Sequence, residues 1–403
     1  MDILRFITAG SVDDGKSTLI GRLLYDTNNI KADVLQSVAG KDSATPNLAH
    51  ITDGLRAERQ GGITIDVAYK YFTTTNRKYI ITDAPGHFQY TKNLVTGASG
   101  VDAMIVLIDV QNGITDQTRR HSLVASFLGI GHIVIAINKM DLVNYDEAIF
   151  TAIRNDYRAM AEKLGLQGIS FIPMSALLGD NVSFLSEKMP WYRGNTLMQY
   201  LENCEPVSTH FDAARFSVQY IIDEAQKGLA GKMLSGVLTT GDEVMVLPER
   251  KISSVKRIVR GYDEATEAAG GENVVVYLSD GVGARRGDLI AHAKETPVLV
   301  NRVEATICWL DAEHDLQPGR RYFLRINAQE TTGTITDVQY KTDINTFEQY
   351  NDGSPVAVNE FARVIIETTD QLSCDSFSKL PENGRGIIID AETNYTAGAF
   401  VIV

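Results

Sequence analysis

The first part of the chain alternates short apolar, β-branched runs with longer segments in which apolar and polar residues mix. The strand-like runs are residues 4–9, 67–73, 78–82, 103–109, 133–138 and 170–174. Short strands separated by helical stretches are typical of a parallel sheet that helices cover on both faces. The pattern therefore predicts an α/β domain that extends to about residue 206, with a short helical segment at 196–204 near its end.

The pattern changes after Glu205-Pro206, because the helical stretches stop and strand-like runs follow one another at roughly even spacing, separated by glycine-rich turns. These runs are residues 215–222, 232–239, 243–247, 252–259 and 273–278, and then 304–309, 322–326, 333–340, 356–367, 386–389 and 400–403. Such spacing favours small β-barrels. We expect a multidomain chain of mixed α/β and all-β class, with a parallel-rich domain at 1–206 and two β-barrels at 207–298 and 299–403.

Composition narrows the functional classes. The chain has 403 residues, and its 44% hydrophobic content supports packed cores throughout. Its formal net charge of −13 argues against binding nucleic acid through bulk positive charge. Its three cysteines, Cys204, Cys308 and Cys374, are far apart and form no C-x-x-C pair. The apolar runs have strand length and are too short to span a membrane. With no leader pattern at Met1, we expect a soluble cytoplasmic protein.

A phosphate-binding loop follows the first predicted strand. The residues that match G-x-x-x-x-G-K-[ST] are Gly10, Ser11, Val12, Asp13, Asp14, Gly15, Lys16 and Ser17, with Thr18 next in the chain. Glycines permit backbone angles that point successive N–H groups into one cradle, and the helix that begins near Lys16 adds its positive end. Lys16 would reach the β- and γ-phosphates, and Ser17 would bind Mg²⁺. A plain strand-turn-helix is the alternative.

A second motif ends the strand at 78–82, where the ligand crevice of an open α/β sheet lies. Its residues are Asp83, Ala84, Pro85, Gly86 and His87. Asp83 would hold a water bound to Mg²⁺, and Gly86 would bring its N–H to the γ-phosphate. Taken alone, the motif could be a strand-ending turn with a capping aspartate.

A long polar connection, residues 26–62, separates the first two strands, and loops of this length are usually functional or mobile. Thr64 lies just after it and supplies a hydroxyl that could be the second protein ligand for Mg²⁺. Hydrolysis of the nucleotide would then loosen this segment, as in a GTPase switch.

Two further motifs would select the base. Asn138, Lys139, Met140 and Asp141 follow the strand at 133–138, and Ser175, Ala176 and Leu177 follow the strand at 170–174. A carboxylate at Asp141 accepts from both N1–H and the N2 amino group of guanine, whereas adenine has no such donor pair. The loop at 175–177 would donate a backbone N–H to the base oxygen. Together with the phosphate loop, these motifs indicate a guanine nucleotide.

We assign the catalytic role to His87 and Lys16. A single histidine is more often a structural hydrogen-bonding group, but His87 follows Gly86 and could reach the water in line with the γ-phosphate. The other six histidines form no H-x-H or H-x-x-x-H pair, and we give them no role.

The order of these motifs, followed by two barrels, resembles the translational GTPases of the elongation factor Tu class. Within that class the chain is much more similar to the large, GTP-hydrolysing subunits of ATP sulfurylase, the sulfate adenylyltransferase subunit 1 family. Ser11 and Asp14 stand where the elongation factors have histidine. Further similarity lies in the runs 62–69, 116–122, 179–182, 189–192, 215–220 and 389–394.

The resemblance implies a GTPase with GTP and Mg²⁺ as cofactors that couples hydrolysis to the synthesis of adenylyl sulfate from ATP and sulfate. Synthesis would occur on a small adenylyltransferase subunit, in a heterodimer or larger complex, without nucleic acid or a membrane. A translation factor that delivers aminoacyl-tRNA is the rival hypothesis, and the acidic balance together with Ser11 and Asp14 disfavours it. A scaffold that binds the nucleotide without hydrolysing it is a third, which Lys16, Thr64 and His87 disfavour.

Overall fold

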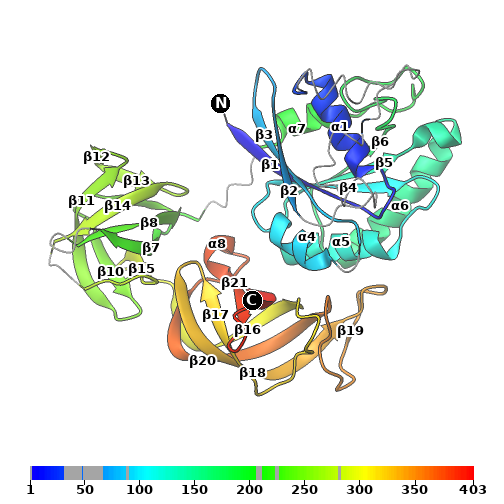
Figure 1. Ribbon diagram of the computed structural model, residues 1–403. Coiled ribbons are helices and arrows are strands. Elements are labelled where there is room, and N and C mark those ends of the chain that lie inside the picture. The colour runs from blue at the N-terminus through cyan, green and yellow to red at the C-terminus, as the bar shows by residue number, and fades with distance from the viewer. Residues whose placement is uncertain are drawn as a thin grey trace. The chain divides into compact units, whose positions relative to one another are not determined.

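The computed structural model describes residues 2–30, 48, 67–87, 90–205, 211–222, 227–279 and 283–403. The described residues form two compact units (Figure 1): an N-terminal unit within residues 1–207, with which residues 344–347 are grouped, and a C-terminal unit within residues 208–343 and 348–403. Thr64, the predicted second ligand of Mg²⁺, lies outside the described residues, and so does most of the long connection between the first two predicted strands.

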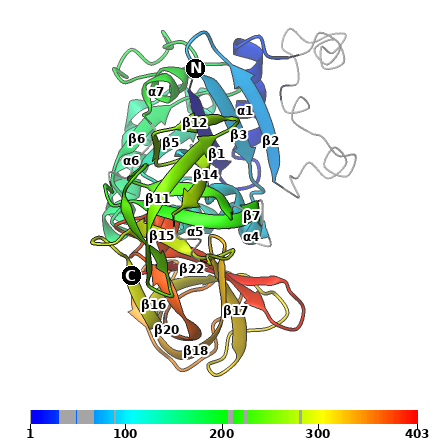
Figure 2. The ribbon, with the colours of Figure 1, turned by 90° about the vertical axis from the view of Figure 1, so that its left-hand side faces the viewer.

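The N-terminal unit is built on one mostly parallel sheet. Its strands are β1 (Ile3–Ala9), β2 (Ala68–Thr73), β3 (Lys78–Asp83), β4 (Ala103–Asp109), β5 (His132–Asn138) and β6 (Ile169–Pro173). They lie in the order β2-β3-β1-β4-β5-β6, and only the β2–β3 pair is antiparallel within the described sheet. Figure 2 shows β6, β5, β1, β3 and β2 in this sequence. Because β1, β3, β5 and β6 are parallel, the loops at their carboxyl ends meet at one edge.

Helices cover both faces of this sheet. They are α1 (Lys16–Asp26), α4 (Thr91–Ala98), α5 (Asp116–Phe127), α6 (Glu147–Lys163) and α7 (Leu197–Asn203), with a short 3₁₀ helix η3 (Met140–Val143). Figure 1 shows α1 and α7 on one side of the sheet and α4 and α5 on the other. All seven residues of β4 are buried, as expected for a strand that is covered on both faces.

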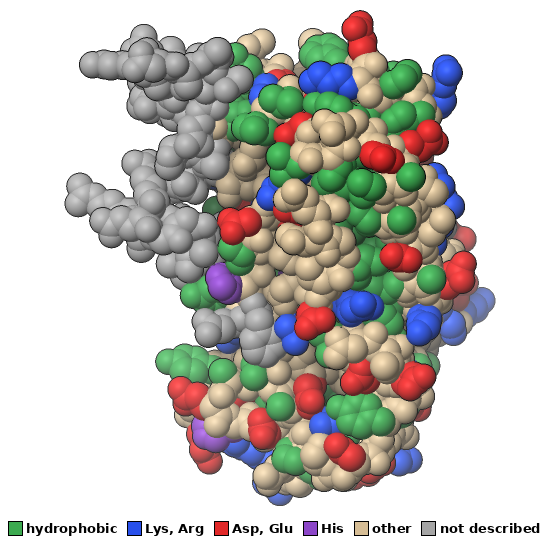
Figure 3. Space-filling model, turned by 90° about the vertical axis from the view of Figure 1, so that its right-hand side faces the viewer, with side chains coloured by type: hydrophobic (Ala, Val, Ile, Leu, Met, Phe, Trp, Pro, Cys, Tyr) green, Lys and Arg blue, Asp and Glu red, His purple; other side chains and the backbone are tan. Residues whose placement is uncertain are grey.

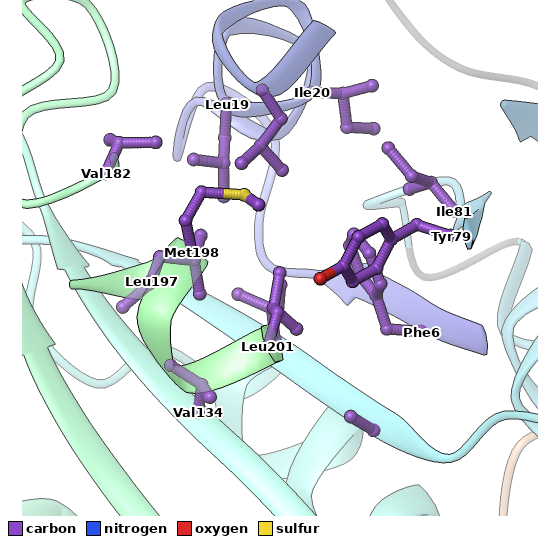
Figure 4. Packing of buried hydrophobic residues seen from close by; sticks show 14 of the residues in the cluster. Phe6, Leu19, Ile20, Tyr79, Ile81, Val134, Val182, Leu197, Met198 and Leu201 are labelled. Carbon is purple, nitrogen blue, oxygen red and sulfur yellow. The ribbon is translucent and has the colours of Figure 1, made fainter. Parts of the chain in front are cut away.

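Leucine and isoleucine side chains of α1 and α7 fill the core on their side of the sheet. In Figure 4, Leu19 and Ile20 of α1 and Leu197, Met198 and Leu201 of α7 converge over the sheet residues Phe6, Tyr79, Ile81 and Val134. Helix α7 begins where it does because Thr196 forms a capping box with Gln199. This packing fixes α1, and therefore the loop that precedes it, against the sheet.

The C-terminal unit consists of two closed antiparallel barrels. The strands of the first are β7 (Arg215–Ile222), β8 (Gly228–Ser235), β10 (Glu243–Leu247), β11 (Lys251–Arg260), β14 (Asn273–Leu278) and β15 (Leu289–His292), with β12 (Asp263–Ala265) beside β11 and a separate β9–β13 pair (Val237–Thr239 and Glu267–Ala269). Pairing of β10 with β11 closes this barrel. Residues that alternate along the strands point inward and form its core.

The second barrel follows the same plan. Its strands are β16 (Val298–Trp309), β17 (Arg321–Ile326), β18 (Gln329–Thr342), β20 (Phe361–Cys374), β21 (Arg385–Asp390) and β22 (Thr396–Ile402), with the short β19 (Gln349–Tyr350) beside β18 and a helical turn α8 (Pro381–Gly384). The β17–β18 pair closes it. Arg215 of the first barrel makes two buried hydrogen bonds, of 2.9 and 3.0 Å, to the carboxylate of Asp375. This ion pair joins the two barrels.

The predicted architecture of a parallel-rich domain followed by two β-barrels is confirmed. The strands predicted at 215–222, 243–247 and 273–278 have the same bounds as β7, β10 and β14. The run predicted at 232–239 is divided between β8 and β9, and β12, β13, β15 and β19 were not predicted. The domain boundaries at 206 and 298 stay predictions.

On the face that Figure 3 shows, acidic and basic side chains are interspersed among apolar and uncharged ones and form no field of a single sign. Within the described part of the chain, no helix has both the length and the apolar character needed to cross a membrane.

Candidate nucleotide-binding site

The phosphate loop has the backbone expected of an anion cradle. Gly10, Asp13 and Gly15 have φ of 151°, 65° and 96°, which are strained or unusual for residues with a side chain. Gly15 is the N-cap of α1 and contributes no side-chain cap, so the first N–H groups of the helix face the loop. This arrangement suits a phosphate group.

Lys16 is buried inside the loop, with 7% of its surface exposed. Its Nζ donates to the carbonyl oxygens of Gly10 at 2.9 Å and Ser11 at 2.7 Å. Burial lowers the pKa of Lys16, although Asp14 and Asp83 act in the opposite direction. A buried ammonium group next to neutral carbonyls is a fitting partner for phosphate oxygens.

The Asp83–Gly86 segment packs directly on the phosphate loop. A Cβ atom at Gly86 would lie 2.5 Å from Nζ of Lys16 and 2.7 Å from the carbonyl oxygen of Gly10, so only glycine fits there. Gln117 of α5 donates from Nε2 to the Gly86 carbonyl at 2.8 Å. Ala84 and Pro85 are buried, and Asp83 is 3% exposed and accepts from the Thr8 hydroxyl at 3.5 Å.

The carboxylate of Asp14 turns back onto the start of its own loop. Its Oδ2 accepts from the Ser11 N–H at 2.6 Å, and burial raises the pKa of this carboxyl group. The Ser11 hydroxyl in turn pairs with the Thr115 hydroxyl at 2.8 Å. Asp14 therefore belongs to the loop as predicted, but its side chain supports the loop from within.

The remaining residues of the loop are more accessible than Lys16 and Asp14. Asp13 is exposed, and Val12, Ser17 and Thr18 are half-buried. The Ser17 hydroxyl and the buried Asp83 carboxylate supply oxygen donors next to the phosphate cradle, which is the donor chemistry that Mg²⁺ prefers.

Asn138 joins the phosphate loop to the loop after β6. Its side-chain amide donates to the carbonyl oxygen of Asp14 at 2.8 Å and accepts from the N–H of Ala176 at 2.9 Å, and both bonds are buried. A Cβ atom at Gly15 would lie 2.4 Å from Nδ2 of Asn138. We expected the loop at 175–177 to donate one backbone N–H to the base oxygen, and within this loop the Ala176 N–H is engaged by Asn138.

The rest of the predicted base-selecting motif continues from this point. Lys139 has a φ of 64°, and its Nζ forms an ion pair with Asp109 at 2.8 Å. Met140 is fully buried and donates its N–H to the Met174 carbonyl at 3.1 Å. Asp141 is half-buried in the first turn of η3. Ser175 is buried and Leu177 is 51% exposed.

Arg22 of α1 was not predicted to be part of the site. Its guanidinium group donates to the carbonyl oxygens of Ala176 at 3.3 Å and Leu177 at 2.5 Å, and it also pairs with Asp26 at 3.3 Å. Thr115, Gln117 and Asp109 were also missed. These residues hold the motifs in place through contacts distant in sequence, which no local pattern signals.

His87 is exposed at the end of the Asp83–Gly86 segment, and its ring lies edge-on to Tyr90 with centroids 6.4 Å apart. A different histidine, His121 of α5, is buried near Lys16. Its Nδ1 has no hydrogen-bond partner among the described residues. Burial lowers the pKa of His121 to about 3, with the charges of Lys16 and Arg120 acting in the same direction.

The fold and this set of loops define a P-loop GTP-binding protein. Residues 1–207 match the family model described as the elongation factor Tu GTP binding domain, and residues 302–403 match the GTP-eEF1A C-terminal domain-like model. The chain therefore belongs to the translational GTPase superfamily.

Comparison with curated proteins identifies the family within that superfamily. Sulfate adenylyltransferase subunit 1 of Teredinibacter turnerae is 44% identical over 99% of this chain and 86% of its own length. The protein of the same name from Cellvibrio japonicus is 44% identical over 100% of the chain and 87% of its length. The bifunctional enzyme NodQ of Rhizobium sp. is also 44% identical over 100% of the chain, which covers 63% of that enzyme. The chain belongs to the sulfate adenylyltransferase subunit 1 family.

Solved structures agree on the fold. The Ski7 GTPase-like domain of S. cerevisiae, bound to GDP and inorganic phosphate, matches 100% of this chain with a TM-score of 0.54 and 17% identity. At that identity the match supports the fold alone.

Proposed function

We propose that this chain hydrolyses GTP and thereby regulates the synthesis of adenylyl sulfate from ATP and sulfate on a separate, smaller subunit. One observation carries the proposal. The phosphate loop, the Asp83–Gly86 segment and the base-selecting loops come together at one sheet edge, linked by Asn138 and by the close approach of Gly86. This occurs in a chain that matches sulfate adenylyltransferase subunit 1 along its full length.

Lys16 and the loop N–H groups would bind the phosphates. Ser17, Asp83 and Thr64 would hold Mg²⁺, which when bound neutralises charge on the β- and γ-phosphates. The Gly86 N–H supports the γ-phosphate, and the absence of a side chain there lets the segment approach Lys16 closely. The chain's contribution is therefore mainly positioning and electrostatic stabilisation.

His87 would orient the attacking water. It follows Gly86 directly, so movement of the Asp83–Gly86 segment carries the imidazole with it. An exposed histidine next to a hinge glycine can turn toward the γ-phosphate without breaking core packing.

Asp141 would set the preference for guanine through its carboxylate, which accepts two donors on one edge of the base. The loss of those hydrogen bonds with adenine leaves a carboxylate without its partners, which disfavours ATP. The only phosphate-loop pattern in the sequence is thereby assigned to GTP. Adenylyl transfer from ATP then requires a second protein.

The test is reconstitution with the purified small subunit. We expect adenylyl sulfate from radiolabelled sulfate and ATP only when both proteins are present, with GTP but not GDP raising the yield. GTP hydrolysis should accelerate when the small subunit, ATP and sulfate are all added. Adenylyl sulfate made by this chain alone would refute the proposal. Acceleration by ribosomes with aminoacyl-tRNA would favour a translation factor instead.

A further inference from the structure

A pocket of about 280 Å³ is lined by residues of α6 and β6 and of the loop that contains Trp191. Figure 1 shows α6 and β6 on the right of the N-terminal unit. None of its lining residues belongs to the nucleotide-binding loops. Aromatic and cationic side chains dominate the lining, which consists of Glu147, Phe150, Thr151, Arg154, Arg158, Ile169, Phe171, Trp191, Tyr192 and Arg193. The pocket includes Trp191 and Tyr192, which belong to the segment 189–192, and none of the proposed nucleotide contacts involves that segment.

The sequence builds this pocket from a helical stripe and a fixed loop. Phe150, Arg154 and Arg158 are four residues apart on α6 and so share one side of the helix. Trp191 donates from Nε1 to the Tyr145 carbonyl at 3.1 Å, and its ring lies 5.3 Å from that of Phe150. The Tyr192 hydroxyl donates to the Asn195 carbonyl at 2.8 Å. These contacts make the aromatic walls rigid.

Two of the arginines lie over aromatic faces. Cζ of Arg154 is 5.6 Å from the Phe150 ring centroid, and Cζ of Arg158 is 5.3 Å from that of Phe171. Such stacking orients a guanidinium group while leaving its edge N–H groups available for hydrogen bonds.

Three arginines and one carboxylate, that of Glu147, line the pocket, so the net charge of its lining is positive. Among the described residues, no carboxylate lies within ion-pair distance of Arg154, Arg158 or Arg193, although the chain carries a net charge of −13. Nε of Arg154 is buried and has no acceptor in the described part of the chain. An N–H group at the pocket wall without an acceptor in the described chain can donate to an acceptor that another molecule brings.

We infer that this pocket is the docking site for a carboxylate-bearing segment of the small subunit, an inference that rests on the proposed function. Aromatic residues and arginine are the types that dominate binding energy at protein interfaces. Arg158 and Arg193 are exposed and Arg154 is half-buried, so the pocket offers both accessible and partly buried cations to an incoming aspartate or glutamate. A nucleic acid is disfavoured because the acidic chain repels a polyanion, whereas one acidic segment needs only local charge.

The experiment measures the dissociation constant of this chain with the purified small subunit by calorimetry. Arg158→Glu and Arg193→Glu should each weaken binding by about 10-fold or more. Lys163→Glu is the matched control, because the substitution makes the same change of charge. Lys163 is exposed on the same helix and does not line the pocket. It should change the dissociation constant less than about 2-fold. All variants should bind GTP like the parent, which shows that the unit is folded.

Trp191 provides a second readout, since the only other tryptophan, Trp309, is fully buried in the second barrel. Emission should change when the small subunit binds, and the change should be absent in Trp191→Phe. If the parent binds and the pocket variants bind equally well, this inference is wrong and the proposed function stands. If the parent fails to bind the small subunit, both are wrong. Tight binding of a uridine 12-mer that Arg158→Glu abolishes, with small-subunit binding unchanged, would overturn the inference in favour of nucleic acid.

Discussion

Asn138 offers a sharp test of how the site is assembled, and Asn138→Ala is the perturbation. The side chain bridges the Asp14 carbonyl and the Ala176 N–H at 2.8 and 2.9 Å, in a buried position. Alanine leaves one buried acceptor and one buried donor without partners. Each such group costs about 1–3 kcal/mol, so the closed arrangement loses about 2–6 kcal/mol.

This penalty falls mainly on the nucleotide-bound form. In the free variant the two loops can separate and let water reach the Asp14 carbonyl and the Ala176 N–H. A nucleotide bound as proposed would span both loops and bring them together again. Because 1.4 kcal/mol is a tenfold change, the lower limit of about 2 kcal/mol predicts about 30-fold weaker binding.

The assay is equilibrium binding of fluorescent GDP and GTP analogues to the parent and the variant. The affinities for GDP and GTP should fall by the same factor, because Asn138 joins the phosphate loop to the loop after β6 and neither contact involves the proposed γ-phosphate position. Asn155→Ala, an exposed position on α6, is the control and should bind like the parent. Affinities within 2-fold of the parent for Asn138→Ala, or a loss confined to GTP, would refute the reasoning.

Three further changes probe other parts of the site. Asp141→Asn should lower the affinity for GTP and raise that for xanthosine triphosphate, because an amide can donate to the 2-oxo group; an unchanged preference in a competition assay would contradict the base assignment. His87→Ala should leave GTP affinity within a few fold and slow single-turnover hydrolysis by about 100-fold; hydrolysis at the parent rate would make His87 structural. Burial lowers the pKa of His121 to about 3, so its contribution to stability is present above pH 6.5 and is lost as the pH falls toward 3, at about 1.4 kcal/mol per pH unit. Thermal midpoints between pH 7 and pH 5 should therefore fall less in His121→Leu than in the parent, and equal slopes would count against a neutral His121.

The sequence predicted best those strands that are short apolar runs between clear turn signals. β10 and β14 are such runs, with the sequences EVMVL and NVVVYL, and their bounds were predicted without error. β12 and β13 have three residues each, too few for a period to appear. The strand predicted at 356–367 begins instead at Phe361, because Val356 pairs with Leu316 and a turn with Asn359 at a φ of 66° follows. Hydrophobic character alone could not separate that bridge from the strand.

In the candidate site, motifs that are continuous in sequence could be predicted, whereas contacts between residues distant in sequence could not. The phosphate loop and the Asp83–Gly86 segment are continuous in sequence, so their backbone requirements can be recognised directly. Arg22 meets the carbonyl oxygens of Ala176 and Leu177 across more than 150 positions, and a helical arginine has many possible partners. Only packing of α1 against the sheet selects that partner.

Ser11 and Asp14 of the phosphate loop also explain how two loops of the site are connected. Asp14 accepts from the Ser11 N–H, and the Ser11 hydroxyl pairs with Thr115, the N-cap of α5. Two residues further on, in the first turn of the same helix, Gln117 donates from its side chain to the Gly86 carbonyl. The phosphate loop and the segment before His87 are thus attached to the same rigid helix terminus. A shift of Gly86 toward a γ-phosphate must either break the Gln117 bond or move the start of α5, and through Thr115 it must then act on Ser11.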